Sequence, residues 1–179
     1  NDMPPTILNG GTSLAPSSDW LESLEWIKLN TPENSVILSW WDYGYWIQTL
    51  AERASIADNS TIHTSIIQNV ARVFLSSPDD SWNMLQEMNA DYVLVFVAGE
   101  RIEGTYDGKQ VFYVRHGGDE SKIQWFVRIS ELPTEKFLDS SHPNNYFWNE
   151  TLLGKLIPFS IVTYYDAKLQ TASDVYQPG

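Results

Sequence analysis

Two short apolar runs with helical patterns between them most constrain the fold of this chain. The first run covers residues 36–40, and the second covers residues 92–97, a length and composition typical of a strand buried on both faces. Between the runs, Ile66, Val70 and Val73 recur at helical spacing. A strand, helices and a second strand predict that the two runs pair in parallel. We therefore expect a mixed α/β fold, with helices packed around a small, largely parallel sheet and a single compact core.

Local patterns predict further elements around this pair of strands. Asp19 and Glu22 match a capping box, and Ser77 followed by Pro78 is a second helix start signal. We expect helices over residues 19–29, 45–52, 62–74 (with cap candidates at 58–61), 78–88, 119–130 and 134–139. Strands are expected over residues 54–57, 110–115 and 159–165, a loop over 99–108, and an aromatic-rich segment over 145–155.

The composition is that of a folded domain and excludes several kinds of site. The chain has 179 residues, of which 42% are hydrophobic and 19% charged, and this length suits one domain. Residues 1–18 are rich in Pro, Gly, Ser and Thr and are expected to form a linker or lead-in, followed by a globular domain over 19–179. The net charge of −12 argues against nucleic-acid binding. Because the chain has no cysteine, disulfides, zinc–thiolate sites and cysteine nucleophiles are excluded.

The segment Trp40-Trp41-Asp42-Tyr43-Gly44 ends the first apolar run and precedes a predicted helix. In α/β proteins, ligands bind in the crevice at the carboxyl ends of the strands. Two indoles beside one carboxylate offer apolar walls, N–H donors and a strong acceptor, which suits a small polar group that also carries carbon. On composition alone, the same residues favour a structural role, as core aromatics and a helix cap.

A second group of residues follows the Gly117-Gly118 turn. Asp119, Lys122 and Phe126 have the spacing i, i+3, i+7 and would form one narrow stripe on a helix. Taken alone, this pattern is also that of an exposed Asp–Lys pair worth a few tenths of a kcal/mol.

Together, the two segments resemble the catalytic subunit of oligosaccharyltransferase, the STT3/AglB/PglB family. The sequence WWDYG is the signature of that family, and its DK motif has the pattern Asp-x-x-Lys-x-x-x-Met/Ile. Asp119 and Lys122 match this pattern, whereas Phe126 stands where Met or Ile is usual. The chain is similar to the soluble C-terminal domain of these proteins over about residues 20–129, and in particular to an archaeal AglB with a short C-terminal domain.

The resemblance implies a role in protein N-glycosylation. The family transfers an oligosaccharide from a lipid carrier to the asparagine of Asn-x-Ser/Thr, and its soluble domain forms the pocket that reads the Ser/Thr. Carried over to this chain, Asp42 would accept a hydrogen bond from that hydroxyl, the indoles would donate, and Lys122 would lie against the same pocket. The substrate-binding residues that the resemblance implies are Trp40, Trp41, Asp42, Tyr43, Gly44, Asp119, Lys122 and Phe126.

The resemblance also implies what this domain leaves to the rest of the enzyme. No catalytic residue and no metal ligand is expected here, because in the family the acidic residues and a divalent metal (Mg or Mn) belong to a multispanning membrane part that would precede residue 1. The expected partners are the acceptor polypeptide and, through the membrane part, the lipid-linked oligosaccharide. The domain would lie on the extracellular face of the cell membrane and would be inactive in isolation.

Two alternatives of other classes remain open. A carbohydrate-binding module could use the 8 Trp and 9 Tyr residues as stacking platforms, which predicts aromatic side chains exposed in a row. A glycosidase could use Asp42 and Asp119 as its paired carboxylates, at a separation of about 5 to 9.5 Å.

Overall fold

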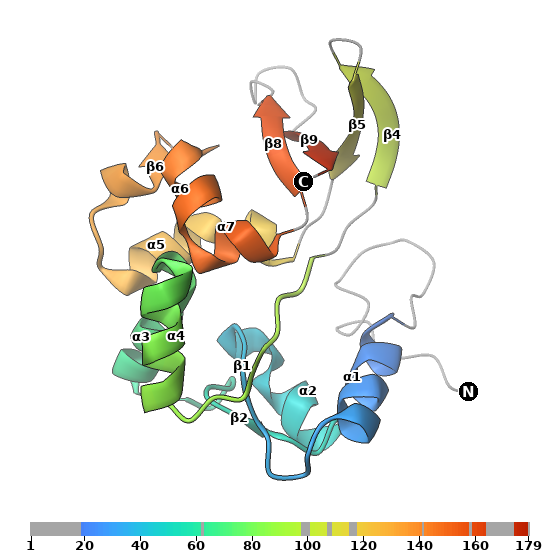
Figure 1. The fold of residues 1–179 in the computed structure, drawn as a ribbon, viewed down its shortest axis with the longest axis vertical. Helices are drawn as coiled ribbons and strands as arrows, with labels where there is room; N and C mark the ends of the chain where they lie inside the picture. Colours follow the sequence, from blue (N-terminus) through green and yellow to red (C-terminus); the bar gives the residue numbers. More distant parts are fainter. Residues whose placement is uncertain are drawn as a thin grey trace.

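A three-stranded parallel sheet joins the two apolar runs, in the lower half of the molecule in Figure 1. The computed structural model describes residues 19–61, 63–97, 101–106, 109–114, 118–140, 142–157, 159–163 and 174–178, and side chains within 19–61, 63–97, 118–140 and 142–157. The strand order is β2-β1-β3, with β1 over Val36–Leu38, β2 over Ala54–Ser55 and β3 over Tyr92–Val93. Ile37 pairs with Tyr92 in parallel register, so the predicted pairing of the two runs is confirmed.

Helices pack around this sheet as expected. They are α1 (Asp19–Asn30), α2 (Gly44–Thr49), α3 (Thr64–Leu75), α4 (Pro78–Glu87), α5 (Ile123–Ser130), α6 (Asn145–Glu150) and α7 (Leu152–Leu156), with 3₁₀ turns η1 (Trp41–Tyr43), η2 (Asp119–Ser121) and η3 (Thr134–Lys136). The start signal of α4 is confirmed, because the Ser77 side chain accepts a hydrogen bond from the Asp80 N–H. Within the described helices, none is both long and apolar enough to cross a membrane.

The core is continuous from the sheet to the upper helices. Val70, Val73 and Phe74 recur on the buried face of α3, as their spacing predicts. The Phe74 ring meets the Phe126 ring of α5 edge to face, with 5.3 Å between centroids. Edge-to-face pairs of this kind contribute about 0.5 to 1.5 kcal/mol beyond the area that they bury. The contact joins the half of the molecule that holds β1 to the half that holds α5.

A four-stranded antiparallel sheet at the top of Figure 1 was not expected. Its order is β4-β5-β9-β8, with β4 over Arg101–Tyr106, β5 over Lys109–Val114, β8 over Phe159–Thr163 and β9 over Asp174–Pro178. The loop prediction for residues 99–108 is therefore wrong over 101–106. β4 pairs with β5 from Arg101↔Val114 to Tyr106↔Lys109, so that only Asp107-Gly108 separate the strands. Asp-Gly is a strong hairpin signal, and the prediction overlooked it.

Three further predictions need correction. The second apolar run forms a strand over Tyr92–Val93 only, and its side chains are half-buried or exposed because β3 is an edge of the parallel sheet. The predicted helix over 134–139 is the turn η3 followed by β6 (Leu138–Asp139), which pairs with β7 (His142–Pro143). Helix α3 begins after His63, and Asp58 instead organises its own turn by accepting hydrogen bonds from Ser60.

One buried guanidinium connects the end of α1 to β2. Arg53 is buried, and its Nε donates to Thr31 Oγ1 (2.9 Å) while Nη2 donates to the Thr31 carbonyl (2.7 Å). Its Nη1 also donates to the Glu52 carbonyl (3.0 Å). The planar fork satisfies carbonyl groups at the end of a helix that have no partner within the helix.

We predict that Arg53→Lys lowers the free energy of unfolding by about 2 kcal/mol. A lysine ammonium cannot reproduce the fork, and hydrogen bonds to a buried charged group contribute about 1.5 to 3 kcal/mol. Urea unfolding of the chain measures the change. Arg72→Lys is the matched control, because Arg72 is only partly buried and donates from Nε to the Ser130 carbonyl. Equal losses in the two variants would contradict the role of Arg53.

Candidate functional site

The WWDYG segment leaves the sheet at the carboxyl end of β1, the position where α/β sheets bind ligands. β1 ends at Leu38, the turn η1 covers Trp41–Tyr43, and α2 begins at Gly44. Gly44 packs directly on the loop after β2, where a Cβ atom would lie 2.1 Å from the Ala57 carbonyl oxygen. Only glycine therefore permits this approach, which fixes the direction in which the segment turns.

The second motif is not the continuous helix that its spacing predicts. Asp119 lies in the turn η2, and α5 begins only at Ile123, with Lys122 at its N-cap position. The Asp119 N–H donates to the Phe96 carbonyl (2.7 Å), and a Cβ atom on Gly118 would lie 2.0 Å from that same oxygen. This close approach to the chain after β3 holds Asp119 away from the axis of α5. Asp119 and Lys122 consequently reach the site from different local structures.

The two motifs nevertheless meet, as the predicted site requires. Lys122 Nζ lies 2.7 Å from Asp42 Oδ2 and donates to the Tyr43 hydroxyl at 2.9 Å. The Tyr43 hydroxyl donates to Asp119 Oδ1 (2.8 Å), and the Phe96 N–H donates to Asp119 Oδ2 (2.9 Å). We call these four side chains, Asp42, Tyr43, Asp119 and Lys122, the polar chain of the site. It links segments that are almost 80 residues apart in the sequence.

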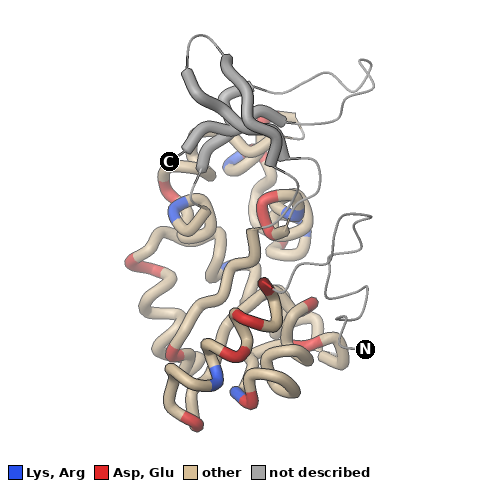
Figure 2. The backbone as a smooth tube through the Cα atoms, turned by 90° about the vertical axis from the view of Figure 1, so that its right-hand side faces the viewer, with Lys and Arg blue, Asp and Glu red and all other residues tan. Residues whose placement is uncertain are grey.

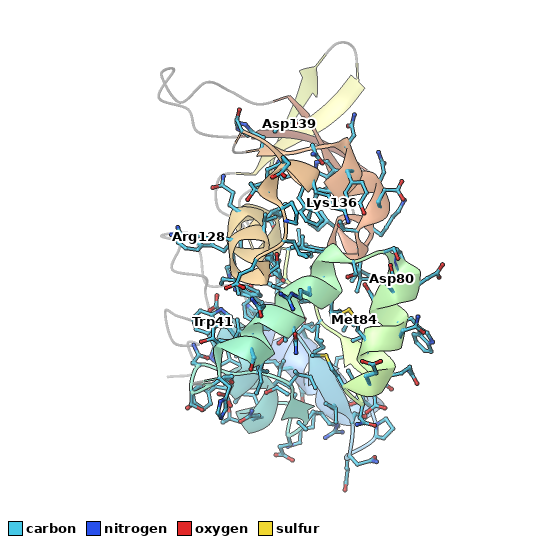
Figure 3. All side chains as sticks on the ribbon, turned by 90° about the vertical axis from the view of Figure 1, so that its left-hand side faces the viewer. Trp41, Asp80, Met84, Arg128, Lys136 and Asp139 are labelled. Atoms are coloured by element: carbon cyan, nitrogen blue, oxygen red, sulfur yellow. The ribbon has the colours of Figure 1, made fainter. Side chains whose placement is uncertain are left out.

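The eight predicted site residues fall into two groups by exposure. Asp42 and Lys122 keep 31% and 26% of their side chains exposed, and Trp41 is also partly exposed. Figure 3 shows Trp41 at an outer edge of the molecule. The other five residues are buried, namely Trp40, Tyr43, Gly44, Asp119 and Phe126. Three side chains are therefore accessible to a ligand at this surface, and the rest hold them in place.

Aromatic packing supports the buried part of the site. The Trp40 ring lies on the Phe126 ring, with 3.9 Å between centroids and 33° between planes. Tyr43 lies against Trp20 of α1, at 5.0 Å between centroids, and Trp20 in turn lies 4.6 Å from Phe96. Trp20 and Phe96 were not among the predicted site residues, although Trp20 stood on the apolar face predicted for α1. No local signal indicates that this face packs on the motif.

Burial shifts the protonation of three groups at or beside the polar chain. Burial, together with the negative charge of Asp119, raises the pKa of Tyr43, so its hydroxyl remains a donor. Burial raises the pKa of Asp119 to about 6, against the opposing effect of its hydrogen bonds. Burial likewise raises the pKa of Glu120 to about 7, and Glu120 Oε2 has no hydrogen-bond partner. At neutral pH Asp119 is thus largely ionised and accepts from Tyr43.

The positions of Asp119 and of the exposed Trp side chains can be compared with the two alternatives, a glycosidase and a carbohydrate-binding module. Asp119 is fully buried and bonded to Tyr43 and Phe96, so it is not placed as one of two carboxylates flanking a substrate. The exposed Trp residues lie on three different helices, Trp26 on α1, Trp82 on α4 and Trp125 on α5. In the described ranges, no group of three or more His, Asp or Glu side chains is arranged to hold a metal ion.

Two hollows on the described surface have linings that include no residue of the polar chain. One, of about 440 Å³, lies beside α5, and the other, of about 550 Å³, lies between α1 and β3. Figure 2 shows Asp and Glu spread over the backbone, mainly in the lower half and along one side, and few Lys or Arg. Lys122 is one of these few cations, and it pairs with Asp42.

Comparison with known proteins points to one family. Residues 33–98 match the family model described as the AglB core domain. The chain is 34% identical over 119 residues to the STT3 subunit of the dolichyl-diphosphooligosaccharide–protein glycosyltransferase of Saccharomyces cerevisiae, and 36% identical over 121 residues to the STT3B subunit of Oryza sativa. These alignments cover 66% and 68% of this chain, but only 15% of each relative.

A solved structure supports the same assignment for the fold. The C-terminal globular domain of the oligosaccharyltransferase AglB from Archaeoglobus fulgidus superposes with a TM-score of 0.52. The superposition covers 93% of this chain and all of that domain, at 20% identity. The chain is thus similar in sequence to AglB and STT3 proteins, and it shares the fold of the AglB C-terminal globular domain.

We predict that raising the pH from about 4.5 to 7 lowers the free energy of unfolding through Asp119 and Glu120. Their pKa values in the folded chain, about 6 and about 7, exceed the ordinary values of 3.8 and 4.5, so the folded state holds protons that the unfolded state has released. Each such proton contributes a slope of up to about 1.4 kcal/mol per pH unit. The stabilisation is complete below pH 4 and is lost as the pH passes 7. Urea unfolding across this range measures the slope.

Glu120→Gln separates this effect from the titration of other groups. The variant keeps a neutral side chain that can accept from the Gly118 N–H, as Glu120 Oε1 does at 2.9 Å. Its slope should be shallower than that of the original chain. Glu135→Gln, on the exposed turn η3, should leave the slope unchanged. An unchanged slope in Glu120→Gln would show that Glu120 is not protonated in the folded state.

Proposed function

We propose that this chain is the acceptor-recognition domain of a membrane oligosaccharyltransferase of the AglB type. In this role it binds Asn-x-Ser/Thr segments of a polypeptide, while the rest of the enzyme delivers a lipid-linked oligosaccharide to the asparagine. The names of its relatives support this reading, because those proteins are glycosyltransferase subunits that act on dolichyl-diphosphooligosaccharide and protein. Since the chain corresponds to 15% of their length, the transfer reaction itself requires the remainder.

The meeting of Asp42 with Lys122 is the observation that carries the proposal. A carboxylate offers about four lone-pair directions, and Lys122 Nζ uses one of them at Oδ2. The remaining directions can accept a hydrogen bond from a serine or threonine hydroxyl. Trp41, partly exposed beside Asp42, supplies an apolar wall for the methyl group of threonine. This combination suits a small side chain that has both a hydroxyl and a carbon atom.

Such a site discriminates strongly against a side chain without the hydroxyl. Valine has the shape of threonine, but it would cover Asp42 without donating a hydrogen bond, so that Lys122 would be the carboxylate's one remaining donor in the site, and the lone pairs removed from water without a partner are costly. The methyl group of threonine adds a smaller preference over serine, about 0.8 kcal/mol for one buried CH₂ equivalent. Recognition of Ser/Thr therefore depends mainly on the carboxylate and only secondarily on the indole wall.

The buried members of the site hold the binding groups in position. Tyr43 donates to Asp119 and accepts from Lys122, which fixes the ammonium beside Asp42. The stacked pair of Trp40 and Phe126 fixes the backbone from which Trp41 and Asp42 project. We assign these residues to positioning rather than to contact with the acceptor.

The chemistry of transfer is assigned to other parts of the enzyme. An amide nitrogen is a weak nucleophile, and we propose that carboxylates outside this chain activate it with a divalent metal, Mg or Mn. The described part of this chain does not fit that role, because it contains no cluster of acidic or histidine side chains that could bind the ion. We further propose that the enzyme is a membrane protein, with this domain on the extracellular face.

We predict that Asp42→Ala in the full-length enzyme weakens binding of an Asn-x-Thr peptide about ten- to a hundredfold. The variant removes the acceptor for the hydroxyl, and a hydrogen bond to a charged group contributes about 1.5 to 3 kcal/mol. Fluorescence anisotropy of a labelled acceptor peptide measures the affinity.

Two controls make the result specific. Asp79→Ala removes an exposed carboxylate in the first turn of α4 and should leave the peptide affinity unchanged. A peptide with valine in place of threonine should bind the original enzyme as weakly as the threonine peptide binds Asp42→Ala. Full affinity of Asp42→Ala for the threonine peptide would refute the assignment.

A further inference from the structure

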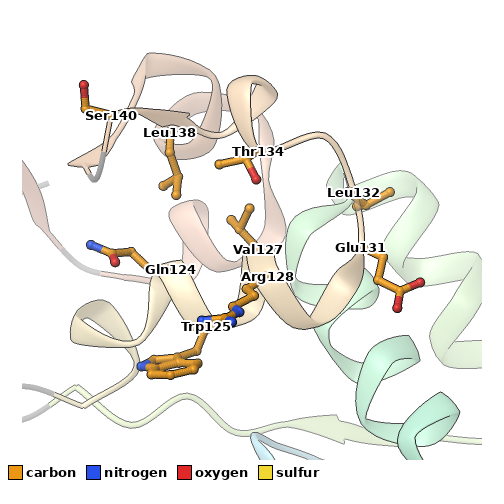
Figure 4. A pocket seen from close by; sticks show the side chains of 9 residues that line it. All are labelled: Gln124, Trp125, Val127, Arg128, Glu131, Leu132, Thr134, Leu138 and Ser140. Carbon is orange, nitrogen blue, oxygen red and sulfur yellow. The ribbon is translucent and has the colours of Figure 1, made fainter.

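A shallow hollow beside α5 has a lining that none of the assignments above uses. Its volume is about 440 Å³, within the range of small-molecule sites, and it lies between α5 and residues 131–140. Figure 4 shows Val127, Thr134 and Leu138 around the space, with Trp125 and Arg128 side by side at its lower edge. We call this region the α5 hollow.

The floor and one wall of the α5 hollow are apolar. Val127 and Leu138 are buried and form the floor. Trp125 is 56% exposed, which leaves much of its indole open to solvent. The guanidinium carbon of Arg128 lies 5.7 Å from the centre of the Trp125 ring, a cation–π distance that restrains both side chains. An exposed indole held in this way is a preformed surface for stacking.

The polar groups around this apolar surface are three neutral side chains, the Arg128 guanidinium and the Glu131 carboxylate. Gln124 extends from the first turn of α5, Thr134 from η3 and Ser140 from the turn between β6 and β7. They bring amide and hydroxyl groups to the hollow from three different elements, and Arg128 adds planar donors. A wholly apolar ligand would leave these groups without new partners. A ligand with one apolar face and a rim of hydroxyl groups matches both parts of the lining, and that is the chemistry of a pyranose ring.

The position of the hollow relates it to the polar chain. The backbone N–H of Trp125 donates to the Lys122 carbonyl at 2.8 Å, so Trp125 lies about one helical turn after Lys122. Figure 3 shows Trp41 and Arg128 at the same edge of the molecule. In an extended acceptor, the asparagine lies two residues before the threonine, a span of about 7 Å. A sugar attached to, or approaching, that asparagine can thus reach α5 while the threonine is held at Asp42.

We propose that the α5 hollow binds a sugar ring of the oligosaccharide that is transferred. The choice of this ligand rests on the proposed function. The ring stacks its apolar face on the Trp125 indole, and its hydroxyl groups bond to Arg128, Gln124 and Thr134. An acceptor side chain is the competing occupant, but it would contact the floor and make few contacts with the polar rim.

Steady-state kinetics of the full-length enzyme test this proposal. The probes are the lipid-linked oligosaccharide extracted from the membranes of the source organism and an Asn-x-Thr peptide. For Trp125→Ala we expect the KM for the oligosaccharide donor to rise about three- to tenfold, the loss expected for one aromatic stacking contact. The KM for the peptide should stay unchanged. Trp125→Phe, which retains an aromatic face, should recover most of the loss.

Trp82→Ala is the matched control, because Trp82 is 63% exposed on α4 and does not line the hollow. It should change neither KM. If Trp125→Ala raises only the KM for the peptide, the hollow binds the acceptor and the proposal is overturned. Unchanged KM values for both substrates overturn it as well, and so does a loss that Trp125→Phe fails to recover.

A different experimental result would refute the proposed function. If Asp42→Ala binds the threonine peptide with full affinity while Trp125→Ala still raises the KM for the donor, acceptor recognition by the polar chain is refuted and the sugar site stands. If Asp42→Ala loses the peptide and Trp125→Ala affects neither substrate, acceptor recognition stands and the sugar site is refuted.

Discussion

The hydrogen bonds of the Tyr43 hydroxyl hold the arrangement of this molecule together. The hydroxyl donates to Asp119 and accepts from Lys122, and thereby connects the segment after β1 to the segment before α5. Asp119 is fully buried, and a buried carboxylate is tolerated only when its oxygens are bonded. Tyr43 satisfies one oxygen and the Phe96 N–H satisfies the other. Separating the two segments would remove the bond from Tyr43 and leave one oxygen of this buried carboxylate without a partner, so the bond favours the observed docking.

The aromatic residues of the site have different roles, which follow from how far each side chain is buried. Trp40 and Trp20 fill the space on either side of η1, on Phe126 and Tyr43 respectively. Trp41, the residue after Trp40, is the indole left partly exposed. A 3₁₀ turn makes this possible, because consecutive residues on a tight turn point in different directions. The repeated tryptophan thus provides one core side chain and one surface side chain from adjacent positions.

The sequence predicted the location of the site better than its local geometry. The parallel pairing of the two apolar runs and the position of the motif after β1 follow from periodicity and from the order of the elements, which are local properties of the chain. The break between Asp119 and Ile123 could not be predicted in this way, because the competing partner of the Asp119 N–H is the Phe96 carbonyl, more than 20 residues away. The hairpin at Asp107-Gly108, in contrast, had a local signal that the prediction overlooked.

The accessible part of the site is small. Asp42, Lys122 and Trp41 are each partly exposed to solvent. A hydrogen bond to a carboxylate that remains in contact with water contributes little, since water competes for the same lone pairs. Strong preference for a hydroxyl therefore requires a second surface that excludes water when the acceptor binds. On this argument the domain supplies the chemical selectivity for serine or threonine, and the rest of the enzyme supplies the burial that makes this selectivity effective.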